Sequence, residues 1–476
     1  MPTELVQHAE ILENDIETVI SLFLRRIGRA DGILLESAEV DGRWGRFSLV
    51  AGDFLLLAGC AEGRLKLTIN DARLEGLKIH DGRPYFEGLK LVMNDISIKG
   101  PDFKNALPPI TRALYGYLGY GAGASVSSEK NPAADGAGGV FGLPGNVYLF
   151  DHSYNQLTRL SLFPPNSSGE KPALPFEPSG QISLGPVASA FSKAAYLKAA
   201  DGIIAAIKNG EVVEAFLSNR FSAPFKGELF DVYRKLRKSN PSPYMFFLRQ
   251  PGFSMAVSSP AVLLGCQKGR LNLSPIAGSR PRGRDLEEDS LFEEELFSSP
   301  KEKAEHAMLV DVGRSDLGGI SVPGSVKVER FMEVERFARA MHLSSRLTAA
   351  LAGGLDAVDA LRAVFPSGSV TGVPKSRAME IIGAREPLPR GPFGGALGWL
   401  GLDKDAVNLD LGLTIRGFWA AGGRLLWQTG SGLVHNSDSD QQWQSILKTS
   451  AEALEALEIN DAVDIKNLSG GEECSF

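Results

Sequence analysis

The spacing of apolar and polar residues divides the first part of the chain into one helix followed by strands. Apolar positions at helical period predict a helix over residues 14–28, with an inward face formed by Ile16, Val19, Ile20, Phe23 and Leu24. Residues 32–53 predict two strands around a polar turn, and strand-like alternation continues to about residue 95. A further strand is expected over NVYLFD, residues 146–151.

Helical periodicity dominates the second part. One helix is expected to begin near residue 191 and to end at Gly210, because glycine readily adopts the conformation that follows a helix C-terminus. Residues 302–318 predict another helix, in which Glu305 shares a face with Met308, Leu309 and Val312. A carboxylate that faces a core needs a partner or a metal ion, although a glutamate in a first helical turn also interacts favourably with the helix dipole.

The last predicted helix, residues 437–457, has a core stripe at helical spacing: Trp443, Ile446, Leu447, Ser450, Leu454 and Leu457. The small, polar residues 121–140 predict a flexible surface loop, and residues 163–190, rich in Pro, Ser and Gly, predict a linker. We therefore expect an N-terminal region at 1–190, a second domain at 191–460 and a polar tail at 461–476.

Composition narrows the class of protein. The 476 residues are 43% hydrophobic and 22% charged, as in soluble globular proteins, and the net charge of −7 without a basic tract argues against nucleic acid as the main partner. No apolar run approaches the ~18–20 residues that span a bilayer, and no signal peptide is evident. The three cysteines lack zinc or disulfide spacing. We expect a cytoplasmic protein with no membrane partner.

The segment EKAEHAMLVDVGRSDLG, residues 302–318, resembles a signature of the chorismate-utilising enzymes, most closely the large subunit of anthranilate synthase. The similarity continues through PGSVKVERFMEVERFARAMHLSS to residue 345, and from 191 onward it is almost continuous to residue 457. It implies an α+β fold, in which large antiparallel sheets pack as a sandwich with helices outside. It also implies that residues 191–460 are a chorismate-binding domain.

The resemblance implies a substrate site with a bound Mg²⁺. Glu305 occupies the position of a metal-binding glutamate, and His342 and Lys375 occupy active-site positions. Substrate contacts are implied for Gly278, Ser279, Phe393, Arg416, Gly430, Ser431 and Gly432. An arginine can meet a substrate carboxylate with two parallel hydrogen bonds, which a lysine would not reproduce. Glycine lets a ligand approach the backbone closely.

Several site positions depart from the family pattern. The second Mg²⁺-binding glutamate of the family is Ser445 here, and a hydroxyl is a weaker ligand for an ion that prefers near-octahedral oxygen coordination. We therefore expect a weakened metal site, which water, Glu214, Asp438 or Asp440 would have to complete. Other site positions are also changed: Glu214, Ala261, Ser315, Phe393, Gln442 and Thr449.

The resemblance also implies regulation and a partner. Anthranilate synthases bind tryptophan as a feedback inhibitor, and the contacting positions correspond to Ser37, Pro243, Tyr244 and Met245. The implied reaction adds ammonia to chorismate, eliminates pyruvate and yields anthranilate. None of the cysteines lies in a nucleophile-elbow context, so a separate glutamine amidotransferase subunit, component II, or free ammonia is expected to supply the nitrogen.

Three alternatives stay open. Aminodeoxychorismate synthases commonly carry a lysine where this chain has Ala277, and isochorismate and salicylate synthases typically use a lysine where it has Glu214, so both are ranked lower. The third alternative is a catalytically impaired homologue that serves as a binding or regulatory module. The altered positions favour it, whereas the retained Glu305, His342, Lys375 and Arg416 and the retained glycine segment favour an enzyme.

Overall fold

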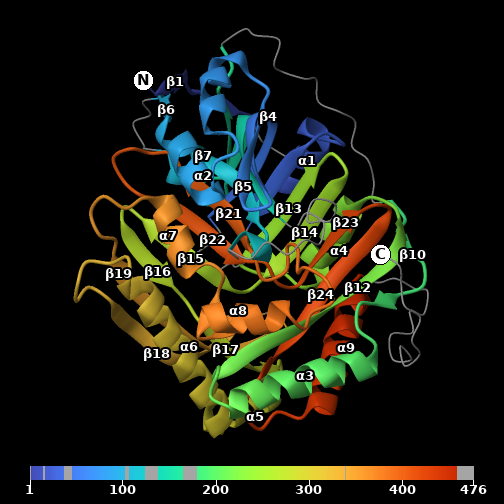
Figure 1. Ribbon diagram of the computed structural model, residues 1–476. Coiled ribbons are helices and arrows are strands. Elements are labelled where there is room, and N and C mark those ends of the chain that lie inside the picture. Colours follow the sequence, from blue (N-terminus) through green and yellow to red (C-terminus); the bar gives the residue numbers. More distant parts are fainter. Residues whose placement is uncertain are drawn as a thin grey trace.

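Antiparallel strands make up most of the fold. The computed structural model describes residues 2–13, 17–36, 46–101, 107–123, 138–164, 180–337 and 339–457. Within these ranges the strands form a long hydrogen-bonded order that folds over on itself, with helices on the outside (Figure 1). The expected α+β fold is confirmed.

Most of the strands form one continuous series in which each strand is hydrogen-bonded to the next, and this series is called the ladder below. It begins with β12 (Glu214–Lys226), β24 (Arg424–Leu433), β23 (Gly417–Ala421), β14 (Phe253–Ser259), β13 (Tyr244–Gln250), β3 (Gly32–Glu36) and β4 (Phe47–Ala61). It continues with β8 (Gly139–Asp151), β7 (Ala113–Leu118), β21 (Ala396–Gly401), β22 (Leu409–Leu413) and β15 (Val262–Gln267). It ends with β16 (Arg270–Leu273) and β19 (Ala340–Ala350), which pairs also with β17 (Ile276–Pro281) and β18 (Lys327–Arg336).

Shorter strands extend this order at its margins. They are β2 (His8–Leu12), β5 (Arg64–Ile69), β9 (Gln156–Ser161), β10 (Ser183–Leu184), β11 (Ala188–Ser189) and β20 (Gly372–Val373). A separate parallel pair joins β1 (Thr3–Val6) to β6 (Ile96–Lys99). Strands from the first 190 residues pair directly with later ones, β3 with β13 and β7 with β21. The domain boundary near residue 190 stays a prediction.

Alternate residues of the strands enter different cores, as expected for a sandwich. Phe246 and Trp419 lie in an inner core between sheet faces, whereas Met245 and Phe247 belong to an outer core. That outer core is covered by α1 (Val19–Arg26), α3 (Lys193–Lys208), α4 (Leu229–Ser239) and α9 (Ser439–Glu455). A second outer core is covered by α2 (Tyr85–Asn94), α6 (Pro300–Gly318) and α7 (Ala357–Val364). The other helices are α5 (Leu286–Ser298), α8 (Lys375–Gly383), η1 (Ala72–His80), η2 (Pro109–Thr111), η3 (Tyr120–Gly123) and η4 (Gly368–Val370).

Most of the expected elements are confirmed. The helix expected at 14–28 is α1, where Thr18 and Ser21 form a capping box and Phe23 is fully buried. The helix expected from 191 is α3, after which Gly210 has a φ of 78°. The C-terminal helix is also present, as are strands β3 and β4 where two strands were expected in residues 32–53. Ile16, residues 124–137 and 165–179, and the tail from 458 lie outside the described residues.

The expected strand alternation up to residue 95 is wrong beyond β5. Residues 72–80 and 85–94 are helical instead. In α2 the buried side chains Tyr85, Leu89, Val92 and Met93 recur at the three- and four-residue spacing of one helix face. The period of the pattern, rather than its apolar content, therefore identifies this element.

The inward face of α6 is also corrected. The fully buried positions are His306, Leu309, Val310, Gly313 and Leu317, and Glu305 lies only partly buried at the edge of this face. Glu305 is therefore not one of the buried residues that form the core face of α6. None of the described helices is long and apolar enough to cross a membrane.

Candidate functional site

His342 on β19 is held by a bulge in the neighbouring strand. The register between β17 and β19 shifts between Ala277 and Arg280, and Gly278 there has a φ of 70°. The Gly278 carbonyl accepts a hydrogen bond of 2.8 Å from His342 Nδ1. Because a carbonyl cannot donate, Nδ1 carries the proton and Nε2 keeps its lone pair. Nε2 is buried and has no hydrogen-bond partner within the described part of the chain.

The electrostatic surroundings keep this imidazole neutral. Burial, together with the positive charge of Arg416, lowers the pKa of His342 to about 4. His342 lies on β19, whereas Arg416 lies in the connection between β22 and β23, so the tertiary fold brings the two side chains together. At neutral pH the side chain can accept a hydrogen bond or a proton at Nε2 but carries no charge.

Gly278 also touches the first turns of α6. A Cβ at this position would lie 2.9 Å from Glu302 Oε2, so the glycine allows the helix to approach the bulge. Glu302 and Glu305 are one turn apart on α6. Burial raises the pKa of Glu305, and the nearby Glu302 raises it further. Ser279, the other residue in the bulge, is exposed.

Glu214 begins β12 and lies against the glycine-containing strand β24. Only 5% of this residue is exposed. A Cβ at Gly432 would lie 2.3 Å from Glu214 Oε1, so the carboxyl occupies space that only a glycine leaves open. Burial raises the pKa of Glu214 to about 8, and the charge of Glu305 is the second cause. The carboxyls of β12 and α6 are therefore close enough to repel each other.

The predicted glycine segment lies near one end of the pairing between β12 and β24, close to the start of β12. Gly430, Ser431 and Gly432 pair with Ser218, Leu217 and Phe216. Ser431 Oγ donates a hydrogen bond to Gln442 Oε1 of α9, which joins this strand to the C-terminal helix. Ser445, one turn further along α9, is exposed.

Arg416 lies between β22 and β23 in an unusual backbone conformation. Its φ of 52° places a bulky residue in the left-handed region, which ordinary side chains seldom adopt and which is enriched at functional sites. The residue is accessible to solvent, yet surrounding protein desolvates the guanidinium and lowers its pKa, while Glu452 of α9 opposes this effect.

Two other predicted site residues, Lys375 and Phe393, contact groups that belong to the scaffold of the fold. Lys375 Nζ donates to Asp316 Oδ2 of α6 at 2.9 Å and lies near the last carbonyls of α7, so its charge is already matched. Phe393 is buried in the inner core, with its ring 6.3 Å from that of Phe216. The catalytic role of Lys375 and the substrate contact of Phe393 stay predictions.

The side chains present can be compared with what Mg²⁺ requires. Across the described ranges no group of three or more His, Cys, Asp or Glu side chains is placed to hold a metal ion. Glu305 and Glu214 are nevertheless close enough to interact, and Glu214 Oε2 is buried without a described hydrogen-bond partner. One or two carboxylates suit Mg²⁺, which usually completes its shell with substrate oxygens and water. The residues therefore fit this ion.

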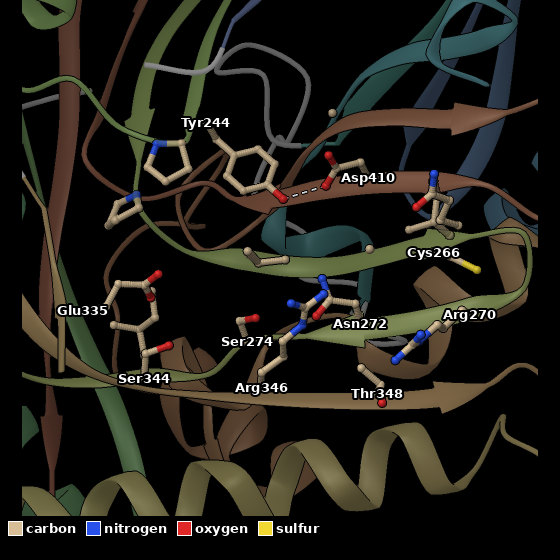
Figure 2. Close-up of a pocket in the computed structure, with 18 of the residues that line it drawn as sticks. Tyr244, Cys266, Arg270, Asn272, Ser274, Glu335, Ser344, Arg346, Thr348 and Asp410 are labelled. Carbon is tan, nitrogen blue, oxygen red and sulfur yellow. Dashed lines mark hydrogen bonds between the residues drawn. The ribbon is translucent and has the colours of Figure 1, made fainter. Parts of the chain in front are cut away.

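Pro243 and Tyr244, two of the predicted tryptophan contacts, line a separate cavity of about 970 Å³ (Figure 2). Tyr244 donates a hydrogen bond of 2.6 Å to Asp410 Oδ1 across it. Met245 lies in the outer core on the opposite face of β13. Ser37 lies outside the described residues. Among the described residues, those predicted to bind substrate or metal do not line this cavity.

Apart from Tyr244, the polar residues that project toward this cavity were not predicted from the sequence. Asn272, Arg346 and Asp410 project toward it from β16, β19 and β22, as Figure 2 shows. Asn272 Oδ1 and Arg346 Nε are buried without hydrogen-bond partners in the described structure. The available signal was Asp410 itself, because an acid within the apolar strand segment LDLGL is seldom placed there without a function or a partner.

Comparison with known proteins identifies the class. The family described as chorismate binding enzyme matches residues 85–454 of the chain. The protein therefore belongs to the chorismate-binding enzyme family.

Within that family, the resemblance to anthranilate synthase large subunits is confirmed. Anthranilate synthase component 1 of Pseudomonas aeruginosa is 32% identical over 458 residues, 91% of each chain. Aminodeoxychorismate synthase component 1 of Bacillus subtilis is also 32% identical, over 91% of this chain and 93% of its own. Identity alone therefore does not separate these two activities.

Solved structures agree on the fold. Anthranilate synthase component I of Streptococcus pneumoniae superposes with a TM-score of 0.68 and 27% identity, covering 87% of this chain and 93% of its own. The menaquinone-specific isochorismate synthase of Escherichia coli has a TM-score of 0.72 at 15% identity, covering 96% of each chain, and shares the fold.

Proposed function

We propose that the chain is the large subunit of an anthranilate synthase. The observation that carries the proposal is a group of neighbouring residues from segments far apart in sequence. His342 is hydrogen-bonded to the Gly278 carbonyl, Gly278 adjoins α6, and Glu214 lies against Gly432 and within the electrostatic influence of Glu305 of α6. Arg416 faces the same histidine. A small dicarboxylate needs fixed donors and charge neutralisation, for which Arg416 and a Mg²⁺ ion held by Glu305 would serve.

The proposed reaction combines chorismate and ammonia to give anthranilate, pyruvate and water. Ammonia adds to the ring, the ring hydroxyl leaves as water, and elimination of pyruvate makes the ring aromatic. Arg416 would pair with a substrate carboxylate, and His342 would accept a proton or orient ammonia through Nε2. Glu305 would hold Mg²⁺, which when bound neutralises a substrate carboxylate.

We also propose a glutamine amidotransferase subunit as the source of ammonia and tryptophan as the feedback inhibitor. Support for the partner comes from the similarity to proteins named anthranilate synthase component 1. Support for tryptophan comes from the cavity beside Tyr244, whose lining includes both acidic and basic side chains suited to an amino acid. Its volume is within the range of small-molecule sites.

The test is product analysis after incubation with chorismate, ammonium and Mg²⁺. Fluorescence identifies anthranilate, and chromatography separates it from aminodeoxychorismate and isochorismate. Anthranilate as the main product supports the proposal, and either of the other products would overturn it.

A catalytically impaired homologue is the second candidate. Ala261 and Ser445 favour it because each replaces a carboxylate of the family site. Chorismate binding without any product would establish this candidate instead.

A further inference from the structure

Glu214 occupies a place in which a carboxyl group is costly. The residue is 95% buried, as its exposed fraction of 5% shows, and Oε2 has no hydrogen-bond partner in the described structure. A buried carboxyl without a partner loses the solvation it had in water and gains nothing in return. Such a group in a native fold calls for a ligand that binds it.

The surrounding protein cations do not fill this role. Lys375 and Arg377, at the start of the neighbouring α8, are paired with Asp316 and with Glu211 and Glu380. Arg390, which donates to the Phe216 carbonyl of β12, forms a buried ion pair with Glu386. These three side chains already have acidic partners, so none of them is available to neutralise Glu214.

Glu305 shows where that charge would sit. The two carboxyls belong to different elements, β12 and α6, and the negative charge of Glu305 acts on the Glu214 carboxyl. Gly432 leaves the space in which the Glu214 carboxyl lies. A dication between the two carboxyls would replace repulsion by attraction and would bind the otherwise unpartnered Oε2.

We propose that Glu214 and Glu305 together hold the Mg²⁺ ion, with Glu214 replacing the carboxylate that Ser445 has lost. The proposal rests on the proposed function only in assigning this ion to chorismate binding. Moving the second carboxylate from α9 to β12 keeps two protein carboxylates, the usual number for Mg²⁺. It also explains why an acid stands at the start of β12, beside a glycine.

The experiment measures metal binding directly, without turnover. Mn²⁺ serves as the paramagnetic probe, its binding is followed by electron paramagnetic resonance, and Mg²⁺ is then used to displace it. Glu214→Gln, which keeps the shape but removes the charge, is expected to weaken Mn²⁺ binding at least tenfold, as is Glu305→Gln. Glu214→Asp keeps the charge but shortens the reach and is expected to fall between parent and Gln variant.

Glu211→Gln is the matched control, because this carboxylate lies three residues earlier and pairs with Arg377 at the surface. It is expected to leave Mn²⁺ affinity within twofold of the parent. Adding Ser445→Glu to Glu214→Gln is expected to restore binding, because a carboxylate returns to α9. Circular dichroism and thermal unfolding confirm that each variant is folded.

The outcomes separate this inference from the proposed function. Unchanged Mn²⁺ affinity in Glu214→Gln would overturn the inference even if anthranilate is formed, and so would a parent that binds no Mn²⁺ at millimolar concentration. Weakened binding in both Gln variants supports it even if the product is not anthranilate. In that case the proposed function alone fails.

Discussion

Buried carboxyls are the residues in which this protein departs most from an ordinary core. Burial raises the pKa of Asp410 to about 6, and the hydrogen bond from Tyr244 limits the rise. Glu214 has the repulsion of Glu305 instead of a donor, and its pKa is raised to about 8. The same effect, loss of water around a negative charge, therefore produces different results according to the neighbour.

Asp410 gives a prediction for stability against pH. Because its folded pKa of about 6 exceeds the ordinary value of 3.8, its contribution to stability is fully present below pH 3.8 and is lost as pH rises through 6. Asp410→Asn removes this loss while still accepting from Tyr244. We expect the variant to be more stable than the parent by about 2–3 kcal/mol at pH 8, with the difference closing toward pH 4.

Urea unfolding at several pH values measures this difference. Asp311→Asn, at an exposed carboxylate, is the control and is expected to change the free energy of unfolding by less than about 0.5 kcal/mol. A variant at Asp410 that is less stable than the parent at pH 8 would contradict the prediction.

Arg416 gives a prediction for activity. Arg416→Ala removes the proposed carboxylate partner, and we expect kcat/KM for chorismate to fall by the equivalent of roughly 2–4 kcal/mol of transition-state stabilisation. Arg416→Lys should recover only part of this loss, because an ammonium lacks the planar pair of donors. Steady-state kinetics on folded variants decides the matter, and an unchanged kcat/KM would remove Arg416 from the site.

At the scale of elements, the sequence predicted those whose apolar period is clear. The helices α1, α3 and α9 and the strands β3 and β8 have regular patterns, so their type could be predicted. The helix α2 was missed because Tyr85, Leu89 and Val92 also suit strands, and only their spacing marks a helix. The buried face of α6 was assigned to the wrong residues, because it includes His306 and Gly313, which an apolar pattern does not mark.

The contact between α6 and α8 gives a prediction that separates structure from catalysis at Lys375. Its ammonium lies 2.8 Å from Asp316 Oδ1, and removing either partner leaves the other partly buried charge unpaired. In a double-mutant cycle with Lys375→Met and Asp316→Asn, we expect a coupling energy of about 0.5–3 kcal/mol in urea unfolding.

Activity measurements complete this cycle. If the ion pair between Lys375 and Asp316 has a structural role, both single variants are expected to lose activity to the same degree. If Lys375→Met abolishes turnover while Asp316→Asn retains it, and the coupling energy is near zero, Lys375 acts on the substrate and the structural interpretation is wrong.

At the scale of the whole molecule, the site depends on how the ends of the strand order meet. Glu214 stands at one end of the ladder and His342 near the other, and α6 lies between them. The family signature predicted the individual residues, including Glu305 and Arg416. Periodicity could not predict that Glu214 faces Glu305, because this proximity arises from tertiary packing between a strand and a helix more than 80 residues apart.

The cavity beside Tyr244 likewise exists only in the folded chain, because its walls come from both the first 190 residues and later strands. A ligand bound there contacts both parts and favours the native state alone. At a hundred times its dissociation constant, tryptophan is expected to add about 2.7 kcal/mol to the free energy of unfolding. Thermal unfolding and calorimetry at millimolar tryptophan measure this effect.

Asp410→Asn provides the site variant for this last prediction, because Asp410 lies in the cavity and is hydrogen-bonded to Tyr244. We expect it to weaken tryptophan binding, since an ionised carboxylate can pair with the ammonium of the amino acid and an amide cannot. Arg416→Ala is the matched control, because Arg416 lies outside the cavity lining, and it should keep the parent's affinity for tryptophan. An absence of any stabilisation of the parent by millimolar tryptophan would exclude the proposed feedback site. Equal affinity in the parent and in Asp410→Asn would instead place tryptophan away from this carboxylate.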